Sequence, residues 1–207
     1  MRFLDSRLRG NDGLAWALLL AALLSPATAQ AVVVDRLEVT QHGDRYRVEM
    51  KVQLEASADS AYAVFADYDN LPRINTAVKK AAVLPETTSP DVSRLQTQVR
   101  MCFSFFCKTL DQVQDMRRMP ESPGGRLSAK VIAERSDLRY GEASWRLSSG
   151  ATAAQSQLEF TAELEPKFWI PPLIGPWVMQ RKLRQEAIQT SEGIERLARD
   201  SIAHAAP

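Results

Sequence analysis

The chain has 207 residues, with 26 lysines and arginines against 25 aspartates and glutamates, and a formal charge of +1 at pH 7. This balance gives no general electrostatic reason to bind nucleic acid, whose affinity depends on neutralising phosphates with lysine and arginine. Only two histidines and two cysteines are present. A His-based catalytic triad or a metal cluster is therefore disfavoured, and we expect no cofactor.

The N-terminus has the features of a cleaved secretory signal peptide, which we predict over residues 1–29. An unbroken apolar run covers residues 14–24, arginines precede it, and small residues with A-x-A spacing end at Ala29. The run is shorter than the roughly 20 residues that a membrane-spanning helix needs. A buried N-terminal helix is the alternative. We expect cleavage after Ala29, with Ala31 as the next candidate, and a periplasmic or otherwise exported mature protein.

Two strands and two short helices are predicted after this leader. Residues 32–40 are strand-like, and residues 45–55 alternate between apolar and charged side chains, which is typical of a half-buried antiparallel strand. Ser57 is a suitable N-cap for a short apolar helix. Pro72 then indicates a break and a second short helical turn.

Six further strands are predicted, one from its strand character and the next five from period-two alternation, which favours an antiparallel meander. Their expected ranges are 78–84, 95–103, 108–116, 127–133, 140–147 and 158–164. The alternation is weakest over residues 108–116, where a bulge would account for it.

Cys102 and Cys107 lie close together in the sequence, on either side of a predicted hairpin turn at Ser104-Phe105. With a two-residue turn, the two cysteines face each other as a non-hydrogen-bonded pair, where Cα atoms approach most closely. In an oxidising compartment this spacing favours a disulfide. A redox-active pair is the alternative, which the lack of CxxC spacing disfavours.

The last third of the chain changes to a helical period. After Gly175-Pro176, which suit a helix start, about 27 residues form an amphipathic stripe. The predicted fold class is therefore α+β, a curved antiparallel sheet wrapped around a long C-terminal helix. A gap between the sheet and this helix would be lined by apolar side chains and would suit a hydrophobic ligand.

Three segments resemble START-like (SRPBCC) proteins: residues 67–72 (Asp-Tyr-Asp-Asn-Leu-Pro), residues 140–145 (Tyr-Gly-Glu-Ala-Ser-Trp) and residues 165–175 before the last helix. The most similar branch is the coenzyme Q-binding and polyketide cyclase/dehydrase group, which has a helix-grip fold. The resemblance implies a START-like ligand-binding domain, predicted over residues 32–203. The export signal departs from the quinone-binding and ribosome-associated members, so we expect no ribosomal or mitochondrial role.

The resemblance and the apolar pattern together predict a hydrophobic ligand, such as a lipid, a quinone or an isoprenoid-like molecule. No residue is singled out as catalytic, and no metal site is expected. The expected ligand-binding residues, in the cavity or at its gate, are mostly aromatic or aliphatic: Phe65, Tyr68, Leu71, Ile74, Val99, Met101, Phe103, Trp145, Phe160, Phe168, Trp169, Leu173 and Trp177.

The aromatic segment at residues 168–179 has three possible roles. It closes one end of the core, it forms a gate over the cavity, or it contacts a membrane together with the basic residues at 181–184. A cyclase or dehydrase acting on a hydrophobic substrate is the alternative function, and it requires at least two polar side chains converging in the cavity. A ligand-free interaction module is a third hypothesis. The sequence does not predict the oligomeric state.

Overall fold

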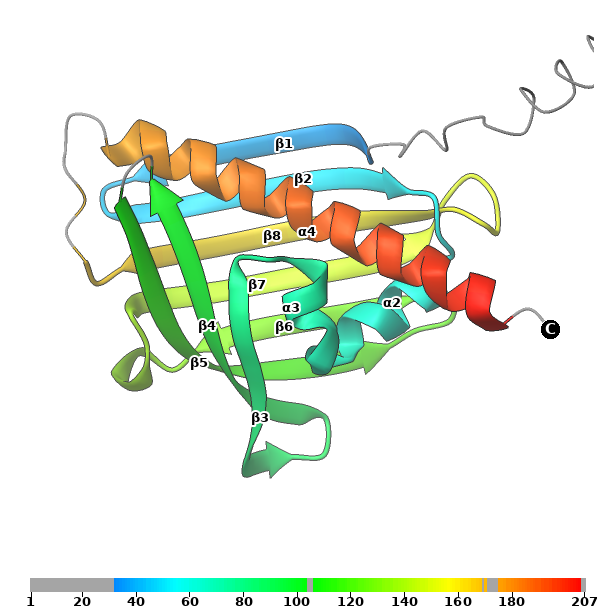
Figure 1. Cartoon of the computed structure of the whole chain (residues 1–207), viewed down its shortest axis with the longest axis horizontal. Helices are drawn as coiled ribbons and strands as arrows, with labels where there is room; N and C mark the ends of the chain where they lie inside the picture. Colours follow the sequence, from blue (N-terminus) through cyan, green and yellow to red (C-terminus); the bar gives the residue numbers. More distant parts are fainter. Residues whose placement is uncertain (1–31, 104–105, 169, 171–174, 206–207) are drawn as a thin grey trace, which may run out of the picture. The chain divides into compact units, whose positions relative to one another are not determined.

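The computed structural model of the protein describes residues 32–103, 106–168, 170 and 175–205 (Figure 1). The predicted signal peptide at residues 1–29 lies outside the described residues. The strands are β1 Val33–His42, β2 Arg45–Leu54, β3 Val78–Ser89, β4 Val92–Phe103, β5 Phe106–Pro120, β6 Gly125–Val131, β7 Leu138–Ser149 and β8 Ser156–Pro166. The helices are α2 Ala58–Ala66, η1 Tyr68–Asn70, α3 Leu71–Ile74, η2 Ala133–Arg135 and α4 Gly175–Ala205.

All eight strands form one antiparallel sheet in the order β1-β2-β8-β7-β6-β5-β4-β3. Strands β3 and β4 and the first part of β5 run steeply across the direction of β1, β2 and β8, and β5 then bends to run beside β6, so the sheet is strongly curved (Figure 1). Helices α2, α3 and α4 lie on the same face of this sheet. The predicted α+β helix-grip fold is confirmed, including the two short helices after the first long strand.

The short helices begin where side-chain caps satisfy free backbone N–H groups. The Ser57 hydroxyl accepts a hydrogen bond from the backbone N–H of Ser60 (3.3 Å), as expected for the N-cap of α2. Asp67 caps the following turn by accepting from the N–H of Asp69 (3.2 Å). Pro72 lies in the first turn of α3, where its missing N–H costs no helical hydrogen bond. These turns place Leu71, Ile74 and Asn75 against the inner face of the sheet.

Helix α4 has 31 residues, slightly more than predicted, and crosses the sheet diagonally (Figure 1). Its buried stripe contains Ala187, Ser191, Ile194 and Ala198. None of the helices in the described residues is apolar over a length that could span a membrane.

The expected bulge in the fifth strand is wrong. The pairing of β5 with β4 and with β6 runs without a register shift. The alternation is weak because Val113, on the outer face of the sheet, is also buried, with 3% of its surface exposed. The Ser136 hydroxyl beyond η2 donates to the Val113 carbonyl (3.0 Å) and accepts from its N–H (2.9 Å). The residues that follow β6, up to Ser136, thus pair with the backbone of β5 at this point.

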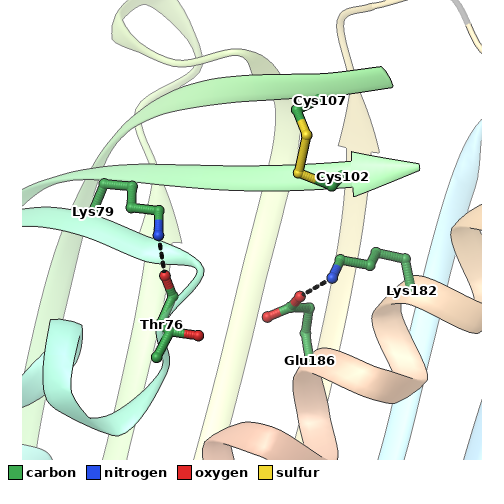
Figure 2. The surroundings of a disulfide bond; sticks show 6 residues. All are labelled: Thr76, Lys79, Cys102, Cys107, Lys182 and Glu186. Carbon is green, nitrogen blue, oxygen red and sulfur yellow. Dashed lines mark hydrogen bonds and ion pairs between the residues drawn. A yellow bond between two sulfur atoms is a disulfide. The ribbon is translucent and has the colours of Figure 1, made fainter. Parts of the chain in front are cut away.

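The predicted disulfide joins Cys102 of β4 to Cys107 of β5 (Figure 2). The two residues are direct cross-strand partners, with their Cα atoms 4.0 Å apart, and Phe103 pairs with Phe106. The expected hairpin register is therefore confirmed. The turn residues 104–105 lie outside the described residues.

Candidate functional site: a cavity between the sheet and the helices

Two adjoining cavities separate the concave face of the sheet from helices α3 and α4. The larger has a volume of about 240 Å³ and the smaller about 180 Å³. They are neighbours because they share six lining residues, which come from five strands and from the segment after α3. These shared residues are Asn75, Val78, Val99, Gln112, Leu138 and Leu164.

Seven of the residues predicted from the sequence line these cavities. The larger cavity is bounded by Trp145, which stacks on Phe160 and meets Phe65 edge to face, each with ring centres 5.2 Å apart. Phe160 contacts Trp145 but does not itself line either cavity. The predicted residues that do line a cavity are Phe65, Leu71, Ile74, Val99, Met101, Trp145 and Phe168.

The other predicted residues lie elsewhere. Tyr68 is buried, and the surface hollow that it lines lies beside Asp67 and Arg118, not at these cavities. Trp177, in the first turn of α4, has 64% of its surface exposed. The side chain of Phe103, together with Trp169 and Leu173, lies outside the described residues.

Asn75 organises a polar cluster where the two cavities meet α4. Its side-chain amide donates to the carboxylate Oε2 of Glu186 (2.8 Å) and to the hydroxyl of Thr190 (3.0 Å). Its side-chain oxygen accepts from the backbone N–H of Ala77 (2.8 Å). The buried amide is thus satisfied on both sides, which fixes the end of α3 against α4.

Glu186 places a carboxylate in the wall of the smaller cavity. Its Oε1 lies 2.6 Å from the Nζ of Lys182, one turn earlier in α4, in an ion pair that lies outside hydrogen-bond geometry (Figure 2). Both side chains are mostly buried, with 16% and 15% of their surface exposed. The pair therefore neutralises its own charge beside the cavity.

Three further polar side chains in the larger cavity are not distinguished by any sequence motif: Thr97 of β4, with Gln112 and Gln114 of β5. They occupy core-facing positions, because Thr97 pairs with Gln112 and buried Leu95 pairs with Gln114. The signal in the sequence is a polar residue where alternation calls for an apolar one. Such a polar residue can be recognised as core-facing only when the pairing register of the strands is known.

A different hollow, of about 610 Å³, lies on the outer face of the sheet. Its lining is polar, and several of its charged side chains are already paired. Lys130 lies 3.2 Å from Glu142, and Asp115 lies 2.8 Å from Arg94 of the neighbouring strand. The apolar cavities on the inner face match a ligand site better, because such sites combine apolar walls with a few polar groups.

A catalytic centre is not evident in the described part of the chain. There, no three residues of the metal-ligating types come together. His42 ends β1, at an exposed turn. The available chemistry in the cavity is therefore hydrogen bonding by amides and a hydroxyl, together with the carboxylate of Glu186.

Comparison with known proteins gives a family and a fold. Residues 54–188 match the family model described as polyketide cyclase/dehydrase and lipid transport. No curated protein sequence matches the chain.

Several solved structures share the fold. The Zhui aromatase/cyclase from Streptomyces sp. R1128 has a TM-score of 0.62 at 15% identity, over 78% of this chain and 98% of its own. Human STARD10 has a TM-score of 0.60 at 9% identity, over 97% of this chain and 84% of its own. TTHA0849 from Thermus thermophilus has a TM-score of 0.59 at 13% identity, over 75% and 98%.

Proposed function

Because this chain belongs to the polyketide cyclase/dehydrase and lipid transport family, we propose that it is an exported protein that binds a hydrophobic ligand. The ligand is a lipid, a quinone or an isoprenoid-like molecule, held between the sheet and α4. The observation that carries the proposal is the pair of adjoining cavities, bounded by Phe65, Trp145 and Val99.

The volume of the cavities supports this function. Protein interiors are close-packed, and voids much larger than a water molecule, which occupies about 30 Å³ in the liquid, are few. The two cavities, of about 240 and 180 Å³, together fall in the range of roughly 300–1,000 Å³ that is typical of ligand sites. Apolar walls of this kind exclude water and gain dispersion contacts when an apolar ligand enters.

The export half of the proposal is supported by the disulfide. Cys102 and Cys107 are both exposed, so a reducing cytosol would act directly on the bond between them. The bond is accordingly suited to an oxidising compartment, to which the predicted signal peptide would direct the chain.

Native mass spectrometry of the protein purified from periplasm tests both halves. We expect a mass that begins at Gln30, together with an additional mass from one bound apolar molecule that denaturation releases. A full-length mass confined to the cytoplasm would contradict export. Protein that carries no ligand, and that takes up none from a total lipid extract, would contradict the binding function.

A peripheral membrane contact is part of the same proposal and is supported by Trp177. This side chain is 64% exposed, and the guanidinium of Arg181 lies 5.6 Å from the centre of its ring. An exposed indole beside a cation suits the interface of an anionic bilayer. Trp177→Ala should weaken cosedimentation with vesicles of anionic phospholipid, whereas Gln185→Ala, at an exposed position further along α4, should not.

A cyclase or dehydrase is the second candidate function. The observation that favours it is the carboxylate of Glu186, which lines the smaller cavity together with the carboxamide of Gln112. If the protein is such an enzyme, the wild type carries product and Glu186→Gln carries substrate. For a dehydrase the substrate is heavier by one water, and for a cyclase the two molecules have equal mass and differ in chromatographic retention. Identical bound molecules in both proteins would favour the binding function.

A further inference from the structure

Thr97, Gln112 and Gln114 form a hydrogen-bonding row on the inner face of the sheet. Thr97 and Gln112 are direct cross-strand partners, and Gln114 follows two residues along β5 on the same face. All three line the larger cavity, and Thr97 is buried, with 4% of its surface exposed. The row therefore faces the space that the proposed ligand would occupy.

None of these three side chains has a hydrogen-bond partner within the part of the chain that the structure describes. The contrast with nearby amides is clear. Asn75 is satisfied by Glu186, Thr190 and the backbone, and Gln98, on the outer face of β4, donates to Asp111 (2.8 Å). Gln112 and Gln114 are half-buried. An apolar ligand that displaced water from the row would leave its polar groups unpaired at a cost, so the row points to a ligand that satisfies them.

The chemistry of the row defines what it would recognise. Carboxamides and a hydroxyl both donate and accept hydrogen bonds but carry no charge. No lysine or arginine lines the larger cavity within the described residues. Glu142 and Glu163 border it, but their carboxylates lie on the outer face of the sheet, where they pair with Lys130 and Arg45. An anionic group would therefore meet neutral donors and no balancing cation, whereas a carbonyl or hydroxyl oxygen would find a partner without a charge penalty.

We propose that the ligand is a neutral oxygenated apolar molecule, and that Thr97, Gln112 and Gln114 determine this specificity by binding its carbonyl or hydroxyl oxygens. Pure hydrocarbons lack the partners that the row needs, and fatty-acid anions carry a charge that the cavity does not balance. This inference rests on the proposed binding function, and it narrows the ligand to one chemical class.

Three probes of one bicyclic shape test the proposal: 2-methylnaphthalene, 2-methyl-1,4-naphthoquinone and 2-naphthoate. The described residues contain no free cysteine with which the quinone could react. By isothermal titration calorimetry, we expect the quinone to bind about tenfold more tightly than the hydrocarbon, the ratio that about 1.4 kcal/mol of hydrogen bonding produces. The anion should bind most weakly.

Variants separate the role of the row from that of the apolar walls. Gln112→Met and Gln114→Met keep the side-chain length and remove the hydrogen-bonding groups. Combined, they should reduce quinone affinity about tenfold and leave the hydrocarbon unchanged or bound more tightly. Gln96→Met is the matched control, because Gln96 is exposed on the opposite face of β4. It should leave all three affinities unchanged.

The outcomes are distinguishable. Equal binding of the quinone and the hydrocarbon to the wild type overturns the specificity proposal and leaves the binding function in place. A double variant that loses both probes equally also overturns it. If no probe binds, and no ligand accompanies the native protein, the binding function itself fails. Should the double variant not fold, the ranking of the three probes on the wild type still decides the question.

Discussion

Tyr68 shows how a single buried group links this fold to pH. Its side chain is 5% exposed, and its hydroxyl has no hydrogen-bond partner among the described residues. Burial raises the pKa of Tyr68 to about 12, although Arg118, whose guanidinium lies 5.7 Å from the ring centre, opposes the shift. Because the folded-state pKa lies above the ordinary value of 10.0, the associated stability is fully present below pH 10 and is lost as the pH rises toward 12.

Tyr68→Phe should therefore keep or raise stability at neutral pH, by up to about 1 kcal/mol, because it removes an unsatisfied hydroxyl. Between pH 8 and pH 11 the variant should lose about 1–2 kcal/mol less free energy of unfolding than the wild type. Urea denaturation at the two pH values measures both effects. A difference between the two proteins that does not change with pH would contradict the assignment.

At the scale of elements, the packing of α4 on α3 depends on Gly193. A Cβ at this position would overlap the carbonyl oxygen of Ile74 and lie 2.6 Å from its carbonyl carbon. These are backbone atoms, which cannot move aside as a flexible side chain can. The close approach also places Ile74 and Asn75 at the cavity.

Gly193→Ala should lower the free energy of unfolding by about 1–3 kcal/mol, because overpacking outweighs the better helix propensity of alanine. Urea denaturation gives the value. Gln185→Ala, at an exposed position on the same helix, should change stability by less than about 0.5 kcal/mol. A more stable Gly193→Ala protein would mean that helix propensity alone governs the site.

At the scale of the whole molecule, the cavity lowers the stability of the ligand-free protein, because its walls lack packing contacts, and it leaves room for a ligand. Val99 lines both cavities, so a larger side chain there fills space that the proposed ligand needs. Val99→Phe should stabilise the ligand-free protein by about 1 kcal/mol. It should also reduce the amount of copurifying ligand at least tenfold.

Calorimetry and native mass spectrometry measure these two effects of Val99→Phe. Val83→Phe is the control, because Val83 is 52% exposed on the edge strand β3. It should alter neither property. Full retention of the ligand by Val99→Phe would place the binding site elsewhere.

Much of the fold could be predicted because its signals are local. Strand character, with alternation in six of the eight segments, predicted the strands, and Ser57 and Pro72 predicted the short helices. The family resemblance is confirmed by the match over residues 54–188. Val113 weakens the alternation of β5, because it is buried on the outer face while polar Gln112 and Gln114 lie on the inner face. The residue that pairs with its backbone, Ser136, comes from a later part of the chain.

The cavity was predictable only in its apolar part. Aromatic and aliphatic residues such as Phe65 and Trp145 were expected at the core face, and the structure places them there. Gln112 and Gln114 were not expected, since their meaning depends on which residues they oppose across β4. Trp177 was predicted on the apolar stripe of α4, yet it faces solvent in the first helical turn.

The pairing of β2 with β8 sets the order in which this fold can be completed. Val52 and its partner Leu158 are separated by more than half of the chain, whereas every other pair of adjacent strands is consecutive in the sequence. Contacts of such long sequence separation form late and slow folding. One edge of the β1–β2 hairpin stays unpaired until β8 is available. The sheet therefore cannot be completed before the second half of the chain has been synthesised. Late completion of the sheet would suit a polypeptide that crosses a membrane before it folds.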